Sequence, residues 1–403
     1  MLTGEADARM PVDHGPSRPL LLVAGLALGP MVALGLGRFA YSLLLPVMRA
    51  DLHWSFAQAG AMNTANALGY LAGAIATGPL IARMRSRRPY VAGLALTALA
   101  VLGSAATASF DAQLGLRLVA GATGAVVFIA GAGLVARLVA DLSPGRSTVL
   151  LGAYFAGAGL GVVVSALVVP PAVGLGAGQS WRRGWVILGT ASLVALVGAV
   201  PAARAAREPR VSRRGGIVGW PLRLLAPTLV AYGLFGAGYI AYITFIVAFL
   251  RSAHLGPGSV SAFWATLGAA AVVAAFVWGP LLGRLRGGRG LGAVLGVLTI
   301  GALLPLILPG SAGDFSSAAI FGGTFLAVVT AVTNMARRLL PPAQVAPAIA
   351  VTTAVFAVGQ VLGPILAGTL SDGRGGVRAG LDLSVVLLVA ATLVSPLQRT
   401  SRS

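Results

Sequence analysis

The sequence predicts an all-α polytopic membrane protein with twelve transmembrane helices in two parallel six-helix repeats. Three observations lead to this prediction. The chain has 403 residues, of which 57% are hydrophobic and only 10% charged, whereas soluble domains carry about 25% charged residues. Apolar runs of about 20 residues, the length of a membrane-crossing helix, recur along the chain. The two halves of the sequence also echo each other at one constant spacing.

Twelve apolar runs are long enough to span a bilayer as helices, and short polar connections separate them. We place these spans at about 20–44, 56–81, 89–109, 113–138, 147–170, 183–203, 221–249, 259–282, 290–309, 315–338, 347–370 and 380–397. No segment between them is long enough for a separate soluble domain, so the membrane part has to perform the function.

Arginine supplies all 29 basic residues, and its distribution predicts the orientation. With the N-terminus in the cytoplasm, 21 arginines fall in the tails, the cytoplasmic loops and the central linker, and six fall on the other side. Cytoplasmic loops of membrane proteins carry such an excess of positive charge. We therefore expect both termini in the cytoplasm, in a multi-pass protein of a bacterial inner membrane. The lipid bilayer explains the net charge of +19, so we expect no nucleic-acid partner.

The internal repeat has an offset of 201 residues, without gaps. The matching segments are Gly35–Tyr41 with Gly236–Tyr242, Gly78–Arg85 with Gly279–Arg286, and Arg137–Val139 with Arg338–Leu340. Six spans per half give both repeats the same orientation, which is the arrangement of parallel transporter repeats. The predicted organisation is a cytoplasmic tail at 1–19, a six-helix bundle at 20–203, a cytoplasmic linker at 204–220, a second bundle at 221–397 and a cytoplasmic tail at 398–403.

Three segments carry a resemblance to a known family. The stretch Gly78-Pro-Leu-Ile-Ala-Arg83-Met-Arg85-Ser-Arg87-Arg88 resembles the loop signature of the major facilitator superfamily, and Gly279–Arg289 repeats it. The segment Arg117–Gly124 resembles the arginine-glycine motif of the fourth span, and Gly35–Pro46 resembles the bacterial YbfB/YjiJ-type branch. The resemblance implies the major facilitator fold and rocker-switch alternating access. It also implies gating residues in the two loops, at Gly78, Arg83, Arg87, Gly279 and Arg284.

The two loops depart from the family pattern at one position. The pattern has an aspartate that latches the cytoplasmic ends of the helices, and this chain has Ala82 there and Gly283 in the repeat. The presence of this latch is therefore open.

Two arginines lie inside predicted spans, where a charge costs roughly 2.5–3.5 kcal/mol on insertion scales. Arg38 has two interpretations. It is either an anion-binding or gating residue of the central pathway, or an arginine that caps backbone carbonyls or reaches the membrane interface. For Arg117 the resemblance implies substrate coupling, and the alternative is an interfacial anchor. The position that corresponds to Arg38 in the second half is Tyr239, and a tyrosine stripe there would suit an apolar anion or serve only for packing.

Neutral polar side chains in the spans complete the predicted lining, or act as contacts between helices. The candidate substrate-binding residues are Arg38, Tyr41, Asn63, Asn66, Arg117, Tyr154, Tyr239, Tyr242, Thr330, Asn334 and Gln360.

Acidic side chains are missing from the middle of every predicted span. Asp51, Asp111, Asp314 and Asp372 are expected in loops and Asp382 at the edge of the last span. Proton-driven transporters commonly use an intramembrane carboxylate, so proton coupling through a buried acid has no support. Facilitated diffusion, anion exchange and coupling through the substrate's own proton or through Asp382 or Asp372 stay open.

The sequence predicts a transporter without enzymatic activity, because no cysteine exists and the three histidines lie in the tail or in loops. We expect a secondary active or facilitative transporter of a small solute, an organic anion or a polar metabolite, that needs no cofactor or metal and functions as a monomer. The alternatives are a drug or metabolite exporter and a membrane sensor on the same fold.

Overall fold

The structure, a computed structural model, describes residues 17–174, 179–206, 208, 225–284 and 288–398, and its regular elements within these ranges are all helices. The first group, here called the N half, consists of α1 (Ser17–Pro30), η1 (Met31–Phe39), α2 (Tyr41–Asp51), α3 (Phe56–Met84), α4 (Arg87–Gly103), α5 (Phe110–Leu138), α6 (Pro144–Gly174) and α7 (Ser180–Ala205). The second group, the C half, consists of α8 (Ala226–Ser252), α9 (Pro257–Arg284), α10 (Gly288–Ile307), α11 (Ser311–Gly322), α12 (Phe325–Leu339), α13 (Pro342–Ser371), α14 (Gly376–Val394) and η3 (Ser395–Leu397).

The helices provide the twelve predicted spans. Eleven stretches of the described chain are long and apolar enough to cross a membrane, among them the continuous runs Pro19–Asp51 and Ser311–Leu339. The twelfth is α4, whose 17 residues rise about 26 Å at about 1.5 Å per residue, close to the hydrocarbon thickness of about 30 Å. The predicted fold class is therefore confirmed. Of the predicted tails and linker, residues 1–16, 209–224 and 399–403 lie outside the described residues, and the domain boundaries stay predictions.

Three expectations about acidic residues are wrong. Asp111 lies in the first turn of α5 and not in a loop. The first span continues to Asp51, seven residues past its predicted end, so this residue ends a helix. The tenth span begins at Ser311, and Asp314 lies in its first turn with a side chain only 5% exposed. Gly310 explains the early start, because its φ of 100° turns the chain into the helix. A carboxylate in a first helical turn is also favourable for the helix dipole.

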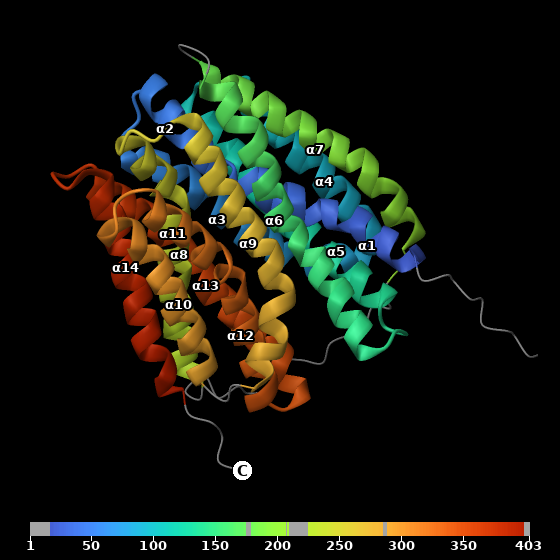
Figure 1. Cartoon of the computed structure of the whole chain (residues 1–403). Coiled ribbons are helices and arrows are strands. Elements are labelled where there is room, and N and C mark those ends of the chain that lie inside the picture. Colours follow the sequence, from blue (N-terminus) through green and yellow to red (C-terminus); the bar gives the residue numbers. More distant parts are fainter. Residues whose placement is uncertain (1–16, 175–178, 207, 209–224, 285–287, 399–403) are drawn as a thin grey trace, which may run out of the picture.

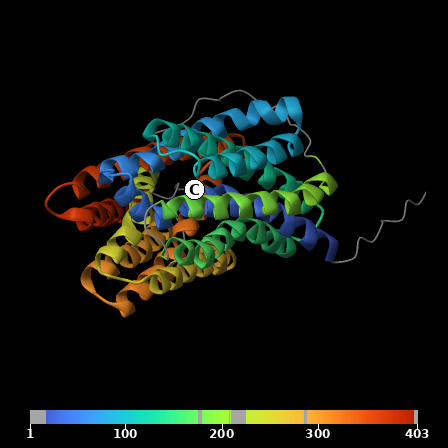
Figure 2. The same ribbon diagram turned by 90° about the horizontal axis from the view of Figure 1, so that it is seen from above.

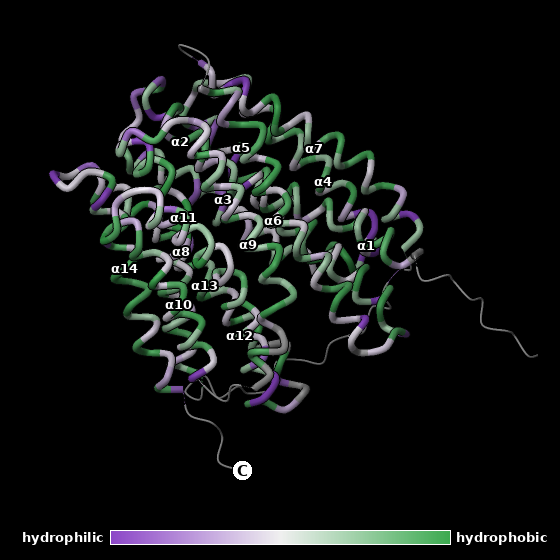
Figure 3. The backbone as a smooth tube through the Cα atoms, viewed as in Figure 1, coloured by the Kyte–Doolittle hydropathy of each residue, from purple (hydrophilic) through white to green (hydrophobic). Residues whose placement is uncertain are grey.

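The two halves lie side by side, with the N half in blue to green and the C half in yellow to red (Figures 1 and 2). They meet mainly where α6 packs on α9, α3 on α13 and α2 on α8. Apolar colour follows the helices and polar colour gathers toward their ends in Figure 3. Many large apolar side chains are exposed on the protein surface, such as Ile75 (70%) and Val197 (73%). Lipid is the surrounding that suits this surface, because exposed apolar area of this extent is unfavourable in water.

Glycines allow the helices of the two halves to approach closely. A Cβ atom on Gly60 of α3 would overlap the carbonyl of Pro364 in α13, and one on Gly368 would overlap the carbonyl of Phe56. The α6–α9 crossing has the same character, since a Cβ on Gly159 would lie 2.8 Å from the Gly268 carbonyl oxygen. Small residues at such crossings are the usual means of close packing in membranes.

The molecule has two ends, which we name by their loops. The arginine-rich end carries the α3–α4 connection with Arg83–Arg88, and the opposite end carries the connections before α3 and after α13. Within the described ranges, six hydrogen bonds between the halves involve residues within about ten positions of the opposite end. They are Phe56 N and Ala57 N to Asp372, Asn63 to Thr244, Thr64 to the Val361 carbonyl, Ser261 to the Ala166 carbonyl, and Trp264 to Ser165.

Candidate substrate site between the two halves

Arg38 is positioned by a local change of helix type. The first span is α-helical to Pro30 and then forms nine residues of π-helix, which end where the Ala40 amide donates to the Gly35 carbonyl at 3.0 Å. Gly35 permits this wide turn next to α6, because a Cβ there would meet the backbone of Gly161. π-Turns inside helices occur frequently at functional sites. Here the turn buries Arg38, whose side chain is 3% exposed.

The Arg38 guanidinium has no carboxylate partner among the described residues, and its Nε and Nη2 donors are buried without a hydrogen bond. It lies 5.5 Å from the ring centre of Tyr70 and interacts electrostatically with Tyr239 of the C half. A buried cation without a counter-charge is costly unless something else satisfies its donors. These two donors of Arg38 are therefore able to bind an anion at the junction of the two halves.

Tyr239 forms the facing part of this junction. The Gln360 amide donates to the Tyr239 hydroxyl, so the hydroxyl proton stays available for another acceptor. The amide oxygen of Gln360 is itself buried without a partner. Next to them, Phe39 of the N half contacts the ring of Phe325 edge-on at 5.8 Å between centroids. The structure thus brings the predicted residues Arg38, Tyr239 and Gln360 into one region.

Arg117 lies deeper inside the N half. Its side chain is 1% exposed, and all three guanidinium nitrogens are without hydrogen bonds. The guanidinium is 5.2 Å from the ring centres of both Tyr41 and Trp185, which supply cation–π attraction. Asn66 donates to the Arg117 carbonyl at 3.1 Å. An interfacial anchor keeps its charged group in water, whereas the side chain of Arg117 is fully buried.

The other predicted lining residues are distributed differently. Asn63 joins the halves through its 2.7 Å bond to Thr244, and the Tyr41 hydroxyl donates to the Ala59 carbonyl at 2.8 Å. Tyr242 shares a hydrogen bond with Ser317. Tyr154 remains within the N half, where its hydroxyl donates to the Phe128 carbonyl at 2.8 Å. Thr330 and Asn334 lie on the part of α12 toward the arginine-rich end, exposed and half-buried respectively.

The predicted gating loop has an acidic partner that the sequence did not reveal. Glu208 accepts from the amides of Ser86 (2.9 Å) and Arg87 (3.2 Å) at the start of α4 and lies 3.7 Å from the Arg87 guanidinium. This contact stays within the N half and its linker, so it does not fasten the two halves together. Gly78 and Arg83 are exposed. Gly279 and Arg284 belong to α9, and their side-chain surroundings lie outside the described part.

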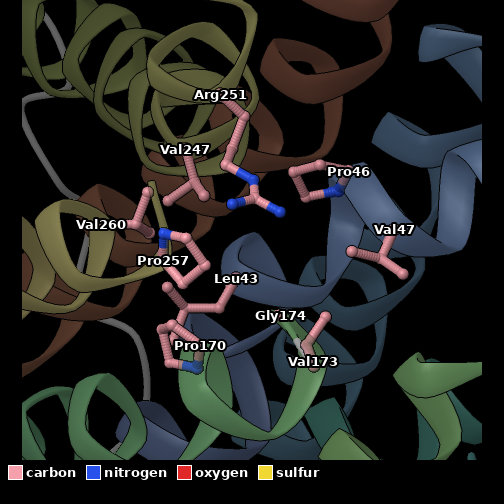
Figure 4. Close-up of a pocket in the computed structure, with 10 residues that line it drawn as sticks. All are labelled: Leu43, Pro46, Val47, Pro170, Val173, Gly174, Val247, Arg251, Pro257 and Val260. Atoms are coloured by element: carbon pink, nitrogen blue, oxygen red, sulfur yellow. The ribbon is translucent and has the colours of Figure 1, made fainter. Parts of the chain in front are cut away.

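At the opposite end, a small pocket lies between the halves (Figure 4). The N half contributes Leu43, Pro46, Val47, Pro170, Val173 and Gly174, and the C half contributes Val247, Arg251, Pro257 and Val260. Figure 4 shows Arg251 reaching from α8 toward Pro46 of α2. Because both halves line this pocket, any rotation of one half against the other changes it.

Sequence reasoning missed two acidic side chains near these contacts. Asp314 is buried and interacts electrostatically with Tyr242. Asp372 accepts hydrogen bonds from the first two amides of α3. The only sequence signal for Asp372 is its position beside the Gly373 and Gly375 turn, which marks a helix end without indicating its partner.

Comparison with known proteins decides the family. Residues 30–396 match the sequence family described as "Uncharacterised MFS-type transporter YbfB". The chain belongs to this family of major facilitator transporters. It is a membrane transporter and not an enzyme, and the predicted family is confirmed.

Relatives and solved structures agree with this assignment. The transporter is 25% identical to the inner membrane transport protein YdhP of Escherichia coli O157:H7, over 90% of this chain and 92% of that protein. It is 26% identical to the MFS-type transporter YceJ of Bacillus subtilis, over 92% and 95%. The fold resembles a bacterial homologue of the human lysosomal transporter Spinster (TM-score 0.68, 17% identity, 96% and 98% coverage). It also resembles the nucleoside transporter NupG (TM-score 0.70, 13% identity, 94% and 98% coverage).

Proposed function

We propose that this protein transports small organic anions by alternating access, with Arg38 as the anion anchor. The carrying observation is that Arg38 is buried at the junction of the halves, with two unpartnered donors and no acid beside it among the residues that the structure describes. An anion with a carboxylate, phosphate or sulfonate group is the ligand that satisfies a guanidinium best. A cationic substrate would meet only repulsion from this group.

The proposed orientation places the arginine-rich end in the cytoplasm of a bacterial cell, because cytoplasmic loops carry the positive charge. The name of the relative YdhP supports an inner membrane location. The halves are bonded near the opposite end, which would then be closed toward the periplasm. On the cytoplasmic side, α12 carries the polar side chains Thr330 and Asn334 along the way to Phe325. Polar residues that are exposed within a span suit a water-filled vestibule better than lipid.

Transport into vesicles tests this proposal directly. Purified protein in liposomes should take up at least one of succinate, pyruvate and benzoate faster than protein-free liposomes do. We expect Arg38→Gln to lower that uptake at least about tenfold, because the charge-assisted hydrogen bonds are lost. The matched control is Arg88→Gln, which removes an exposed arginine from the α3–α4 region. The proposal is wrong if none of the three anions moves, or if a folded Arg38→Gln variant retains wild-type uptake.

A further inference from the structure

The C half presents a set of aromatic rings in which each ring is nearly parallel to its neighbours. The set, here called the aromatic wall, consists of Tyr232, Phe235, Tyr239, Tyr242, Phe321, Phe325 and Phe356. Neighbouring rings in it have centroids 4.0 to 6.1 Å apart and planes inclined by only 8° to 23°. The rings come from four helices, α8, α11, α12 and α13, so no single helix imposes this near-parallel orientation.

Most other described ring contacts lack that orientation, and the exception is the pair Tyr41 and Trp185 of the N half, whose planes are inclined by 13°. Trp54 meets Phe110 at 84°, Phe56 meets Phe245 at 72°, and Phe39 meets the edge of the wall at 84°. Aromatic pairs adopt either the offset-stacked or the edge-to-face arrangement with similar ease. Seven rings, each nearly parallel to its neighbours, therefore form a surface whose geometry matches a further flat ring.

The internal repeat keeps only part of the wall, because the positions that correspond to Tyr242 and Phe356 carry Tyr41 and Phe155 in the N half, whereas the other five carry no aromatic residue. The positions 201 residues before Phe321 and Phe325 carry Ala120 and Gly124 in the N half. The position that corresponds to Tyr239 is Arg38. The N half thus supplies the charge and the C half supplies the rings at equivalent places of the fold. This division matches a ligand with a charged group at one side and a flat apolar body at the other.

One ring contact and one electrostatic interaction across the junction bring the charge near the wall. Arg38 interacts electrostatically with Tyr239, and Phe39, the next residue, touches Phe325. The Tyr239 hydroxyl accepts from Gln360, so its proton is directed to a second acceptor. The guanidinium donors of Arg38 and this hydroxyl can bind the two oxygens of one carboxylate. The ring attached to that carboxylate would then lie along Tyr239, Phe325 and Phe356.

We propose that the transported anion is an aromatic carboxylate, whose carboxylate binds Arg38 and whose ring stacks on the aromatic wall. This inference rests on the anion anchor proposed above and adds the substrate class. The wall is closed in this state, since Tyr239 is 4% and Phe325 2% exposed. Separation of Phe39 from Phe325 by a rotation of the halves opens it. A bound aromatic carboxylate bridges the two halves and holds them together around itself.

The test compares ligand pairs that differ only in aromaticity. Binding of benzoate and cyclohexanecarboxylate, and of 2-naphthoate and its decahydro analogue, is measured through ligand-dependent thermal unfolding of the purified protein. We expect each aromatic acid to bind about tenfold more tightly than its saturated partner, because ring stacking adds affinity beyond buried area. Phe325→Leu and Phe356→Leu should each reduce this ratio toward one, whereas the matched control Phe128→Leu, in the N half, should leave it unchanged.

The outcomes separate this inference from the proposed function. If saturated and aromatic acids bind wild-type protein equally and Arg38→Gln abolishes both, the anion anchor holds and the aromatic substrate class is wrong. If binding of the aromatic acids does not depend on Arg38, the anion anchor itself is wrong. If neither benzoate nor 2-naphthoate stabilises the protein, the aromatic carboxylate inference is wrong.

Discussion

Asp372 should control how firmly the halves close at the opposite end. It follows α13 directly, and its carboxylate accepts from the amides of Phe56 (2.6 Å) and Ala57 (3.0 Å) at the start of α3. The remaining first-turn amide of α3, that of Gln58, is bonded to Ser55, so Asp372 completes the cap from the other half. An acid is unfavourable at its own helix C-terminus and favourable at the N-terminus of α3. Its stabilisation therefore exists only while the halves touch here.

The magnitude follows from the two bonds. A hydrogen bond to a charged group contributes about 1.5–3 kcal/mol, and solvent exposure of Asp372 favours the lower end of this range. Asp372→Ala should thus cost the closed state about 1.5 kcal/mol, which changes the ratio of closed to open molecules about tenfold. Asp372→Asn should have a smaller effect, because one acceptor oxygen remains. Some effect should persist, because the charge is lost.

Cysteine labelling measures this shift, because the natural chain contains no cysteine. A single cysteine in place of Val247, which is 1% exposed and lines the pocket between the halves (Figure 4), reacts with a polar maleimide only when this end opens. The reaction rate should rise about tenfold in Asp372→Ala. The control is Asp382→Ala, which removes an exposed acid of α14. An unchanged rate in Asp372→Ala, or an equal rise in Asp382→Ala, would refute the role of Asp372 in closing the opposite end.

Three further substitutions test other contacts of the structure. Glu208→Gln should lower the unfolding midpoint by about 2–4 °C, since the cap of α4 loses about 1 kcal/mol; an unchanged midpoint would contradict this role. Gly60→Val should increase labelling at the opposite end and stop transport, because its Cβ overlaps α13, while Gly115→Ala, with no atom near its Cβ, should change neither. Arg117→Met should raise the unfolding midpoint of ligand-free protein, because replacing buried ions by apolar residues often stabilises by 1–4 kcal/mol. The exposed Arg88→Met should not change it.

The fold could be predicted because its signals are local or periodic. Twenty-residue apolar runs mark the spans, and the 201-residue repeat fixes the parallel halves independently of any contact. The π-helix at Met31–Phe39 could not be predicted in this way. Apolar composition is the same for α- and π-turns, and the wide turn depends on the fit of Gly35 against Gly161 of another helix.

The candidate site was predictable in part. A charged residue within an apolar span identifies Arg38 and Arg117, and the repeat identifies Tyr239, because burial of a charge is readable from its neighbours in sequence. As substrate contacts these residues stay predictions. The partner of Asp372 could not be predicted, because it lies 316 positions away at Phe56. The near-parallel orientation of the rings in the aromatic wall could not be predicted either, since ring planes depend on the packing of four helices.

The acids stabilise two states of the transporter to different degrees: the state closed at the arginine-rich end and the state closed at the opposite end. The loop motifs lack their aspartate at Ala82 and Gly283, and the nearest acid, Glu208, binds only to the N half. The opposite end has Asp372 as a latch between the halves. Without ligand, the free energy therefore favours the state closed at the opposite end. A ligand can reverse such a preference only through a difference in its affinity for the two states. An anion that bridges Arg38 and the aromatic wall supplies this difference. It binds more tightly to a state in which it contacts both halves than to a state in which these surfaces are separated.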